Sequence, residues 1–327
     1  MLKNKNTYPV DLVYLWCNDA DPNWHNKRIQ YLIKEKNLDV QATHSCRFAS
    51  HNELKYSLRS AAKFAPWINH IFIVSDHQTP DWLNLKNPKI SMVNHEDILP
   101  AGVLPLFNSS AIEIALGNIK NLSEHFLFAN DDMFFGNTVT PDFFFTPENK
   151  AIVRFRKPPK KKKIARSQYG RYIAAMQKLS AEKLGLYCSA FPHHCIDAYL
   201  RSDYATAMER FCELASQTTK QRFREENALQ RVIVSYYMLA QDHAVSKMVK
   251  DFDEWQPWYQ KLKNRIMRNR KPDSFCININ SPKGFAKLLR TQPPLFCIND
   301  TENKNGIQID VPEFLEQLFP DKCEFEK

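Results

Sequence analysis

Short apolar runs that end abruptly in polar clusters mark the first half of the chain. Four of these runs are rich in β-forming residues and predict buried strands: Val10–Cys17, His70–Val74, Lys89–Val93 and His125–Ala129. Asn52–Phe64 instead carries apolar residues at helical spacing and is followed by Pro66, so a helix is predicted there. Strands that alternate with helices indicate an α/β fold built on a mostly parallel sheet.

Helical periodicity dominates the second half of the chain. One apolar face runs from Ile196 to Leu214 and another from Leu229 to Ala240, and both follow the repeat of an amphipathic helix. Two short strands and a final helix are predicted after these faces, at Phe275–Ile279, Leu295–Ile298 and Pro312–Phe319. The second half is therefore expected to be mainly helical.

Two local patterns predict shorter features. Ser110–Glu113 has the spacing of a capping box, in which a serine and a glutamate satisfy the first backbone N–H groups of a helix. A helix is therefore predicted from Ser110 to about Asn121. Lys157–Lys163 contains two prolines and four consecutive lysines, and is expected to be an exposed, mobile loop.

Composition excludes several classes of protein. The 327 residues include only seven glycines, with no Gly-x-Gly-x-x-Gly and no Gly-Lys-Ser/Thr loop, so an ordinary dinucleotide fold or a P-loop is not expected. Eight cysteines without any Cys-x-x-Cys argue against a zinc knuckle and favour reduced thiols. Met1–Asn6 is followed by no apolar signal region, and no apolar stretch could span a bilayer. A cytoplasmic protein is predicted.

The net charge of +9 indicates an anionic partner, either nucleic acid, an anionic lipid or a phosphorylated substrate. Much of the excess lies in Arg154–Lys163 and Lys261–Lys271. No recognition helix, zinc finger or RNP motif accompanies either run, so nucleic acid is not expected to be the partner. A solvated basic surface explains each run equally well.

Acidic residues follow three of the predicted strands, at Asp19–Asp21, Asp76 and Asn130-Asp131-Asp132. Ligands bind beyond the carboxyl ends of parallel strands, so these groups are expected to share a pocket. Adjacent carboxylates with phosphate ligands suit Mg²⁺. An ordinary turn is the competing explanation for the Asn-Asp pair.

Two further patterns carry candidate chemistry. Arg47-Phe48 precedes Asn52–Arg59, a helix whose charges also fit simple surface pairing. His193-His194 offers a general base, and Arg222-Phe223-Arg224 offers planar guanidinium groups for phosphate. Histidines of this kind are also common as structural residues.

Together these stretches resemble the Stealth family of hexose-1-phosphotransferases, which includes bacterial capsule polymerases and the catalytic part of animal N-acetylglucosamine-1-phosphotransferase. Four blocks match in order: Asp11–Pro22, Arg47–Pro141, His193–His243 and Phe296–Glu326. The first block departs from the usual Trp-Val-Asp-Gly-x-Asp, because Asn18 and Asp19 replace its first aspartate and glycine. The third lacks the proline that normally follows its histidine by two residues.

The resemblance implies a GT-A-like, Rossmann-type α/β fold with a helical insertion. It implies one catalytic domain over residues 1–327, with a nucleotide-sugar-binding part at 1–156, a helical part at 190–250 and a C-terminal part at 272–327 that completes the site. The implied reaction transfers a sugar-1-phosphate from a UDP-sugar to a polysaccharide or lipid-linked glycan acceptor, with release of UMP, in capsular or exopolysaccharide synthesis. The implied cofactor is Mg²⁺ or Mn²⁺. An acceptor at the inner face of the membrane would give Lys160–Lys163 a peripheral membrane contact.

The resemblance also implies roles for individual residues. Asp131 or Asp132, joined by Asp300, would bind the metal. His194 or His193 would accept the proton of the acceptor, and Arg224, with Arg222 or Arg59, would stabilise the phosphoryl oxygens. Substrate would also contact a further set of side chains: Asp19, Arg47, Asn52, Asp76, Asn108 and Asn130. Two alternatives stay open: an ordinary metal-dependent glycosyltransferase that releases UDP, and a basic module that binds nucleic acid or membrane without catalysis.

Overall fold

The computed structural model describes residues 8–35, 43–249, 272–300 and 309–327. The predictions made for Met1–Asn6 and for the basic run Lys261–Lys271 lie outside these residues. Within them, no helix combines the length and the apolar character needed to cross a membrane.

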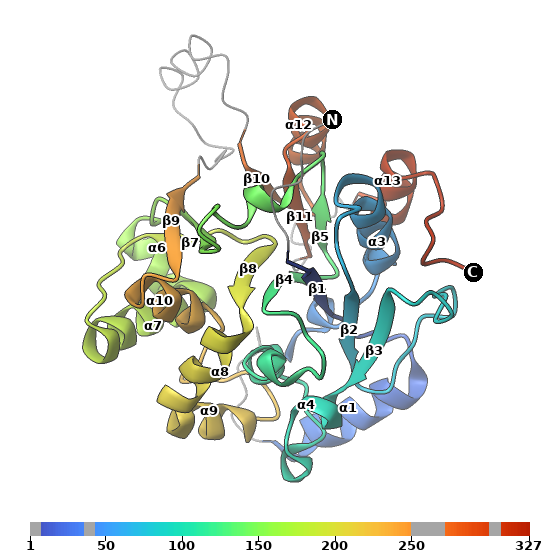
Figure 1. The fold of residues 1–327 in the computed structure, drawn as a ribbon. Helices are drawn as coiled ribbons and strands as arrows, with labels where there is room; N and C mark the ends of the chain where they lie inside the picture. Colours follow the sequence, from blue (N-terminus) through green and yellow to red (C-terminus); the bar gives the residue numbers. More distant parts are fainter. Residues whose placement is uncertain (1–7, 36–42, 250–271, 301–308) are drawn as a thin grey trace.

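A five-stranded sheet with the order β3-β2-β1-β4-β8 forms the centre of the fold (Figure 1). Its strands are β1 (Val10–Leu15), β2 (Ile71–Ser75), β3 (Ile90–Asn94), β4 (His125–Asn130) and β8 (Asp197–Leu200). The first four run parallel and β8 is antiparallel to β4. The predicted α/β fold with a mostly parallel sheet is therefore confirmed, and the four strands predicted in the first half all exist.

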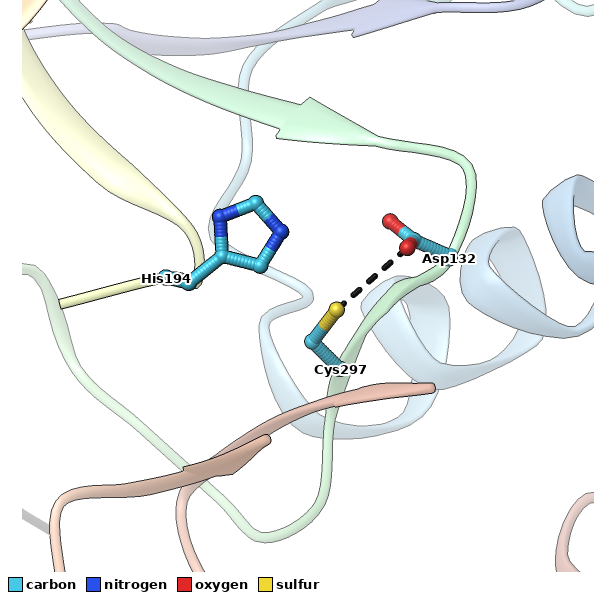
Figure 2. A group of neighbouring side chains, drawn as sticks. All are labelled: Asp132, His194 and Cys297. Carbon is cyan, nitrogen blue, oxygen red and sulfur yellow. Dashed lines mark hydrogen bonds between the residues drawn. The ribbon is translucent and has the colours of Figure 1, made fainter. Parts of the chain in front are cut away.

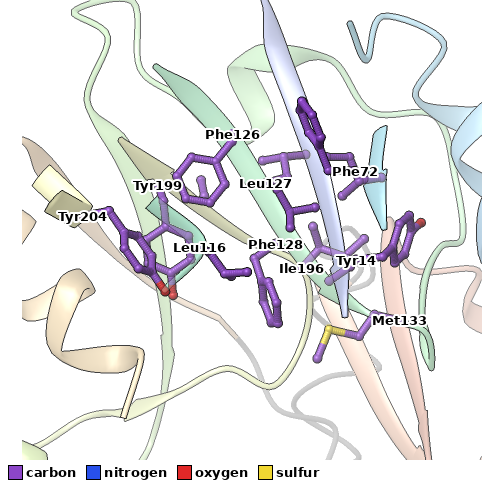
Figure 3. Close-up of a cluster of buried hydrophobic side chains, with 14 of the residues drawn as sticks. Tyr14, Phe72, Leu116, Phe126, Leu127, Phe128, Met133, Ile196, Tyr199 and Tyr204 are labelled. Atoms are coloured by element: carbon purple, nitrogen blue, oxygen red, sulfur yellow. The ribbon is translucent and has the colours of Figure 1, made fainter. Parts of the chain in front are cut away.

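Aromatic side chains fill the core around this sheet (Figure 3). Phe126, Leu127 and Phe128 of β4 are fully buried, and Tyr199 and Tyr204 pack beside them from β8 and the helix that follows. Full burial of side chains of this size contributes about 1.5–3 kcal/mol each. The continuous apolar run of β4 is thus typical of a parallel strand covered on both faces.

Helices join these strands. They are α1 (Pro22–Lys34), α3 (Glu53–Phe64), α4 (His95–Ile98) and α5 (Ser109–Glu113), followed by α8 (Arg201–Arg210) and α9 (Cys212–Thr219). Asp21 caps α1, because its carboxylate accepts the backbone N–H groups of Asn23 and Trp24. Part of the acidic cluster after β1 therefore serves a helix terminus.

A second sheet of order β10-β11-β5 lies beside the first and contains β10 (Ser274–Asn278), β11 (Leu295–Asn299) and β5 (Met133–Phe135). The helices α12 (Pro282–Thr291) and α13 (Val311–Leu318) belong to the same C-terminal part. Helix α3 bridges the two sheets: Tyr14 of β1 and Ser57 of α3 share a hydrogen bond of 2.8 Å, and the Ser57 hydroxyl donates to the carbonyl of Met133 at 2.5 Å. The C-terminal strands and helix were predicted within one or two residues.

A third sheet of order β7-β6-β9 stands on the other side of the molecule, to the left in Figure 1. It consists of β6 (Ala151–Arg156), β7 (Phe191–Pro192) and β9 (Ala244–Met248), and is accompanied by α6 (Lys161–Arg166), α7 (Gln168–Leu184) and α10 (Val232–Ala240). Of these elements the sequence predicted only the α10 helix. The expected loop at Lys157–Lys163 is wrong at its end, because helix α6 begins at Lys161.

Two other local predictions are wrong. The apolar face from Ile196 begins in strand β8, because Asp197–Leu200 pairs with β4 as an edge strand before the helices start. The predicted capping box at Ser110–Glu113 is also absent: the Asn108 side chain caps α5, and Glu113 pairs with Arg231. Helix α5 ends at Glu113, well short of Asn121, and a 3-10 turn at Leu116–Asn118 follows.

A buried ion pair attaches the C-terminus of the chain to α3. The Arg59 guanidinium donates to Glu326 Oε1 and Oε2 at 2.8 and 3.0 Å, and to the carbonyl of Phe319 at 2.6 Å. The side chains of Arg59 and Glu326 are only 4% and 2% exposed. Glu316, on α13, accepts from the same guanidinium. All three guanidinium nitrogens of Arg59 thus donate to the C-terminal segment.

Removal of one partner of this pair should be costly. We expect Arg59→Met to lower the free energy of unfolding by about 3–5 kcal/mol, because Glu326 would be left buried without its cation. The double variant Arg59→Met/Glu326→Leu should recover part of this loss. Urea unfolding monitored by circular dichroism measures both.

A matched control is Lys89→Met, which removes an exposed partner of Glu324 at 3.9 Å. Exposed pairs of this kind contribute about 0–1 kcal/mol. If Arg59→Met costs no more than Lys89→Met, the ion pair does not hold the C-terminus.

Candidate active site

A cavity of about 640 Å³ opens at the carboxyl ends of the central strands. Its floor is formed by residues that directly follow β1, β2 and β4, and β11 adds Ile298–Asp300. Helices α7 and α10 and the strands β7 and β8 form the opposite wall. This position agrees with the expectation that ligands bind beyond the strand ends of a parallel sheet. Of the residues predicted for the site, nine line the cavity: Arg47, Asp76, Asn130, Asp131, Asp132, His193, His194, Arg224 and Asp300.

Four carboxylates meet at one end of this cavity. Asp131 and Asp132 occupy the turn at which the chain leaves β4 for β5, and Asp300 follows β11. Glu53, in the first turn of α3, completes the group. The backbone N–H of Ile298 donates to the carbonyl of Asp132 at 2.9 Å, which fixes the acidic turn against the end of β11.

Burial and mutual repulsion hold these carboxyl groups in an unusual state. Burial raises the pKa of Asp132 to about 7, and the charge of Glu53 adds to the effect. The pKa of Asp131 is raised well above its ordinary value by burial, Glu53 and Asp132. Burial also raises the pKa of Glu53 itself. A bound cation would relieve this repulsion.

The donor atoms fit a metal ion. Asp132 Oδ1 is buried and has no hydrogen-bond partner among the described residues, so an acceptor oxygen is available. Asp132 Oδ2 accepts the Cys297 thiol at 3.3 Å, and His194 lies on the other side of the same space (Figure 2). Ligand atoms from Asp132, His194 and Cys297 all lie within 4.8 Å of one another. The oxygen ligands suit Mg²⁺ with substrate phosphates, whereas the sulfur and nitrogen suit softer ions.

The two histidines differ in their surroundings. His193 is 4% exposed and its ring is hydrogen-bonded to the hydroxyl of Ser274. His194 is half-buried and lines the cavity wall, with the ring of Tyr169 edge-on to it at 6.1 Å. Burial and nearby arginines lower the pKa of His193 to about 3 and that of His194 to about 4. Both imidazoles are therefore neutral at pH 7, the form that can accept a proton.

Several arginines line the cavity. Arg224 lines it and donates to the hydroxyl of Ser109, and Arg47 reaches Gln168 at 3.3 Å. Arg231, which was not among the residues predicted from the sequence, also lines the cavity. This side chain pairs with Glu113 at 3.1 Å and Asp197 at 2.7 Å and stacks over the Phe128 ring at 4.2 Å. Its charge lies beside His194 and is one reason for the lowered pKa of that histidine.

The structure places five predicted site residues outside the cavity lining. Asp19 accepts hydrogen bonds from Nε and Nη2 of Arg28. Arg59 forms the ion pair with Glu326 described above. Asn52 precedes α3 in a left-handed conformation with φ of 63°, and its side chain makes no capping hydrogen bond. The other two are Asn108 and Arg222.

Asn108 and Arg222 support the cavity wall from behind. The Asn108 amide is fully buried and donates to the carbonyls of Gln221 and Phe223 at 3.0 and 3.4 Å. Arg222 donates to the carbonyl of Pro105 at 2.8 Å and lies over the Tyr31 ring. Both therefore fix the loop that presents Arg224.

Part of the cavity lining is aromatic. Trp24, Phe48 and Phe107 pack against one another there, and Asp76, paired with Lys27 at 2.6 Å, follows β2. Trp24 Nε1 and His95 Nδ1 are buried without a hydrogen-bond partner among the described residues. An aromatic wall with unsatisfied polar atoms can receive a planar, hydrogen-bonding group such as a nucleobase.

Glu53 and Trp24 line the cavity and Cys297 is buried beside Asp132, and none of the three was selected from the sequence. Glu53 stands directly after Asn52, and Cys297 lies in the Phe296–Asp300 run, so both belong to stretches that had been singled out. A carboxylate in the first turn of a helix commonly interacts with the helix dipole, so the sequence alone does not distinguish Glu53 as a residue of the acidic cluster. Nothing in the local sequence distinguishes Cys297 from the other seven cysteines.

Comparison with known proteins supplies the family. Conserved region 2 of Stealth proteins matches residues 47–153, the segment that contains Arg47, Glu53, Asp131 and Asp132. Among solved structures, the galactosyltransferase LgtC in complex with donor and acceptor sugar analogues aligns with 95% of this chain and 95% of its own, at 10% identity and a TM-score of 0.42. That likeness is too weak to argue from.

Curated relatives are similar over most of the chain. A capsular polysaccharide phosphotransferase of Haemophilus influenzae is 32% identical over 84% of this chain and 79% of its own length. Another, of Neisseria meningitidis, is 29% identical over 92% and 80%. An exopolysaccharide phosphotransferase of Streptomyces coelicolor is 33% identical over 83% of this chain, which spans 47% of that longer protein. This chain belongs to the Stealth family, together with these bacterial phosphotransferases.

Proposed function

We propose that this enzyme transfers a sugar-1-phosphate from a UDP-sugar to a hydroxyl group of a glycan acceptor in capsular or exopolysaccharide synthesis. The observation that supports this most directly is that Asp132, His194 and Arg224 line one cavity although they come from separate parts of the chain. A carboxylate group for a metal, a neutral base and a phosphate-binding cation are the components that phosphoryl transfer requires. Family membership supports the same reaction class.

In the proposed reaction the acceptor hydroxyl oxygen attacks the phosphorus that carries the sugar. The bond from that phosphorus to the oxygen bridging the two phosphates breaks, and UMP leaves with the bridging oxygen. The proton of the hydroxyl passes to the base, and the product is a phosphodiester between sugar and acceptor. An ordinary glycosyltransferase would instead attack the anomeric carbon and release UDP.

We assign metal binding to Asp131 or Asp132 together with Asp300. Mg²⁺ held there, or Mn²⁺, would neutralise charge on the diphosphate of the donor. Glu53 adds negative charge to the same site, and His51, whose backbone N–H donates to Glu53, is hydrogen-bonded to Asp300 at 3.4 Å. His51 therefore positions the Asp300 carboxylate.

His194 is the better candidate for the base. Its imidazole faces Asp132 and Cys297 (Figure 2). The His193 ring is instead buried and hydrogen-bonded to Ser274. Burial, with the nearby charges of Arg231 and Arg224, lowers the pKa of His194 and keeps its imidazole neutral until it accepts a proton. Arg224 would lie along the phosphoryl oxygens, and Asn130 and Arg47 would contact the donor nearby.

The donor nucleotide is assigned to the aromatic part of the cavity, near Asp76, Trp24 and His95. The three parts of the proposed single domain all contribute: residues 1–156 provide the acidic turn, 190–250 provide His194 and Arg224, and 272–327 provide Asp300. We further propose a cytoplasmic enzyme that meets a lipid-linked acceptor at the inner membrane face. Lys160, Lys161 and Lys162 are exposed and suited to that contact.

The reaction class is tested by the nucleotide released. Incubation with a panel of UDP-sugars, an oligosaccharide acceptor and Mg²⁺ should yield UMP in proportion to product. Asp132→Asn should lower turnover by about 10²-fold or more, because one oxygen ligand of the metal loses its charge. Asp142→Asn, at an exposed site on the surface, is the control. Release of UDP would support the glycosyltransferase alternative and contradict the proposal.

The base assignment predicts a difference between neighbouring residues. His194→Gln should lower kcat by about 10²–10⁴-fold, the usual contribution of a general base. His193→Gln keeps a polar group for Ser274 and should act mainly on stability. Stopped-time assays of UMP across pH compare the two variants. Equal losses of kcat in both, or none in His194→Gln, would contradict the assignment.

Stability measurements test the metal site without turnover. The folded pKa of Asp132 lies above its unfolded value, so metal-free protein loses stability from this group as pH rises from about 4 through about 7. At pH 8, Asp132→Asn should be about 2–4 kcal/mol more stable than the wild type without metal. Saturating Mg²⁺ should reverse that order, because only the wild type binds it with full charge.

Thermal melts at pH 5 and pH 8, with chelator or with Mg²⁺, measure these differences. The control is Asp242→Asn: Lys150 lowers the pKa of Asp242, so this substitution should give a small effect of the opposite sign. An Asp132→Asn variant less stable than the wild type at pH 8 in chelator would refute the electrostatic account.

A further inference from the structure

We propose that Asp132, His194 and Cys297 form an inhibitory binding site for thiophilic divalent ions, above all Zn²⁺. The proposal deepens the proposed function, on which it rests for the role of His194. It concerns an ion of different chemistry from Mg²⁺, because one of the three donors is sulfur and another is nitrogen.

The spacing of the donors is close to that of a tetrahedral site. Zn–N and Zn–O bonds of about 2.0 Å and a Zn–S bond of about 2.3 Å require ligand atoms about 3.3–3.5 Å apart. Cys297 Sγ and Asp132 Oδ2 are already 3.3 Å apart. All three donors lie within 4.8 Å, so rotation of the His194 ring toward the other two would close the site (Figure 2).

The protein holds two of these donors in place before any ion arrives. Cys297 is opposite Met133 in the antiparallel pairing of β11 with β5, and its side chain is fully buried. Asp132 is fixed by the hydrogen bond from Ile298 to its carbonyl, and its buried Oδ1 has no partner among the described residues. Cys297 is a free thiol. A preorganised pair of this kind lowers the cost of ordering the site on binding.

His194, the third donor, connects the site to the cavity and explains how a bound ion would inhibit the enzyme. Asp132 and His194 both line the cavity, so an ion can enter from there and keep a fourth position open to solvent or substrate. Zn²⁺ bound to the imidazole would occupy the lone pair that the proposed base needs. It would also take Asp132 from Mg²⁺. Both effects stop transfer.

Magnesium does not compete for the sulfur. Mg²⁺ requires oxygen ligands in octahedral geometry, whereas Zn²⁺ and Co²⁺ accept thiolate and imidazole together. Cys297 therefore sets the preference of this site for soft ions. Replacement of Cys297 by serine keeps a hydrogen-bond donor for Asp132 and removes the thiolate.

Titration of the metal-free 327-residue protein with Co²⁺ tests the site without catalysis. The wild type should show a thiolate-to-cobalt charge-transfer band in the near ultraviolet and the intense visible absorption of tetrahedral Co²⁺. Cys297→Ser should lose the charge-transfer band. His194→Gln should keep that band while its affinity for Co²⁺ falls by at least about tenfold. Cys212→Ser, which removes an exposed thiol on α9, is the matched control and should behave as the wild type.

Inhibition is measured as UMP release with Mg²⁺ in excess and Zn²⁺ added. Zn²⁺ should inhibit the wild type and Cys212→Ser, and the Zn²⁺ concentration for half-inhibition should rise at least about tenfold in Cys297→Ser. Thermal melts confirm that the variants are folded. A wild type without the charge-transfer band, or a Cys297→Ser variant that retains it, overturns the proposal. If no donor yields UMP while the cobalt bands follow this pattern, the proposed function fails and the metal site stands.

Discussion

The antiparallel pairing of β5 with β11 is the interaction on which the site depends. Only the acidic turn Asp131-Asp132 separates the end of β4 from the start of β5. Because β4 belongs to the central sheet and β5 pairs with β11, both sheets fix the position of that turn. The hydrogen bond from Ile298 to the Asp132 carbonyl fixes the register. A slip by one residue would turn every side chain of β5 to the opposite face and remove Cys297 from Asp132. The C-terminal part of the chain thus decides the geometry of carboxylates that come from the first half.

This arrangement has an electrostatic cost that a bound cation removes. The turn concentrates Asp131, Asp132 and Glu53 where burial already opposes ionisation. Other buried carboxylates in the described structure have donors beside them: Glu326 has Arg59, and Asp11 accepts from the Asn69 amide and the backbone N–H of Ser123. The acidic turn differs because a thiol, a neutral imidazole and other acids lie beside Asp132. Such an uncompensated cluster is more consistent with ligand binding than with a structural role.

Parts of the fold and site followed from the sequence because their causes are local. The apolar runs of β1, β2, β3 and β4 and the polar residues after them predicted both the sheet and the acids at its edge. Tyr199 was predicted to be helical because the apolar residues that follow it have helical spacing. It lies in a strand because pairing with β4 overrides that local preference. The strands β6 and β9 pair over about ninety residues of sequence, and no local pattern reports such a contact. The similarity to GT-A folds, the division of the domain and the roles of single residues stay predictions.

The arginines show why residue type alone could not locate the phosphate-binding groups. Arg59 and Arg224 have the same chemistry in the sequence, and both were expected near phosphate. Arg59 meets Glu326, 267 positions away, and its guanidinium is thereby fully engaged in holding the C-terminus. Within the part of the chain that the structure describes, Arg224 donates only to a serine hydroxyl, and it lines the cavity. A guanidinium that meets a neutral partner at a cavity wall keeps an uncompensated charge for a ligand. The charge of one that is paired with a buried carboxylate is already compensated. The distinction arises from contacts distant in sequence, and the loop behind Arg224 is likewise secured by long-range hydrogen bonds, from Asn108 to the Gln221 carbonyl and from Arg222 to the Pro105 carbonyl.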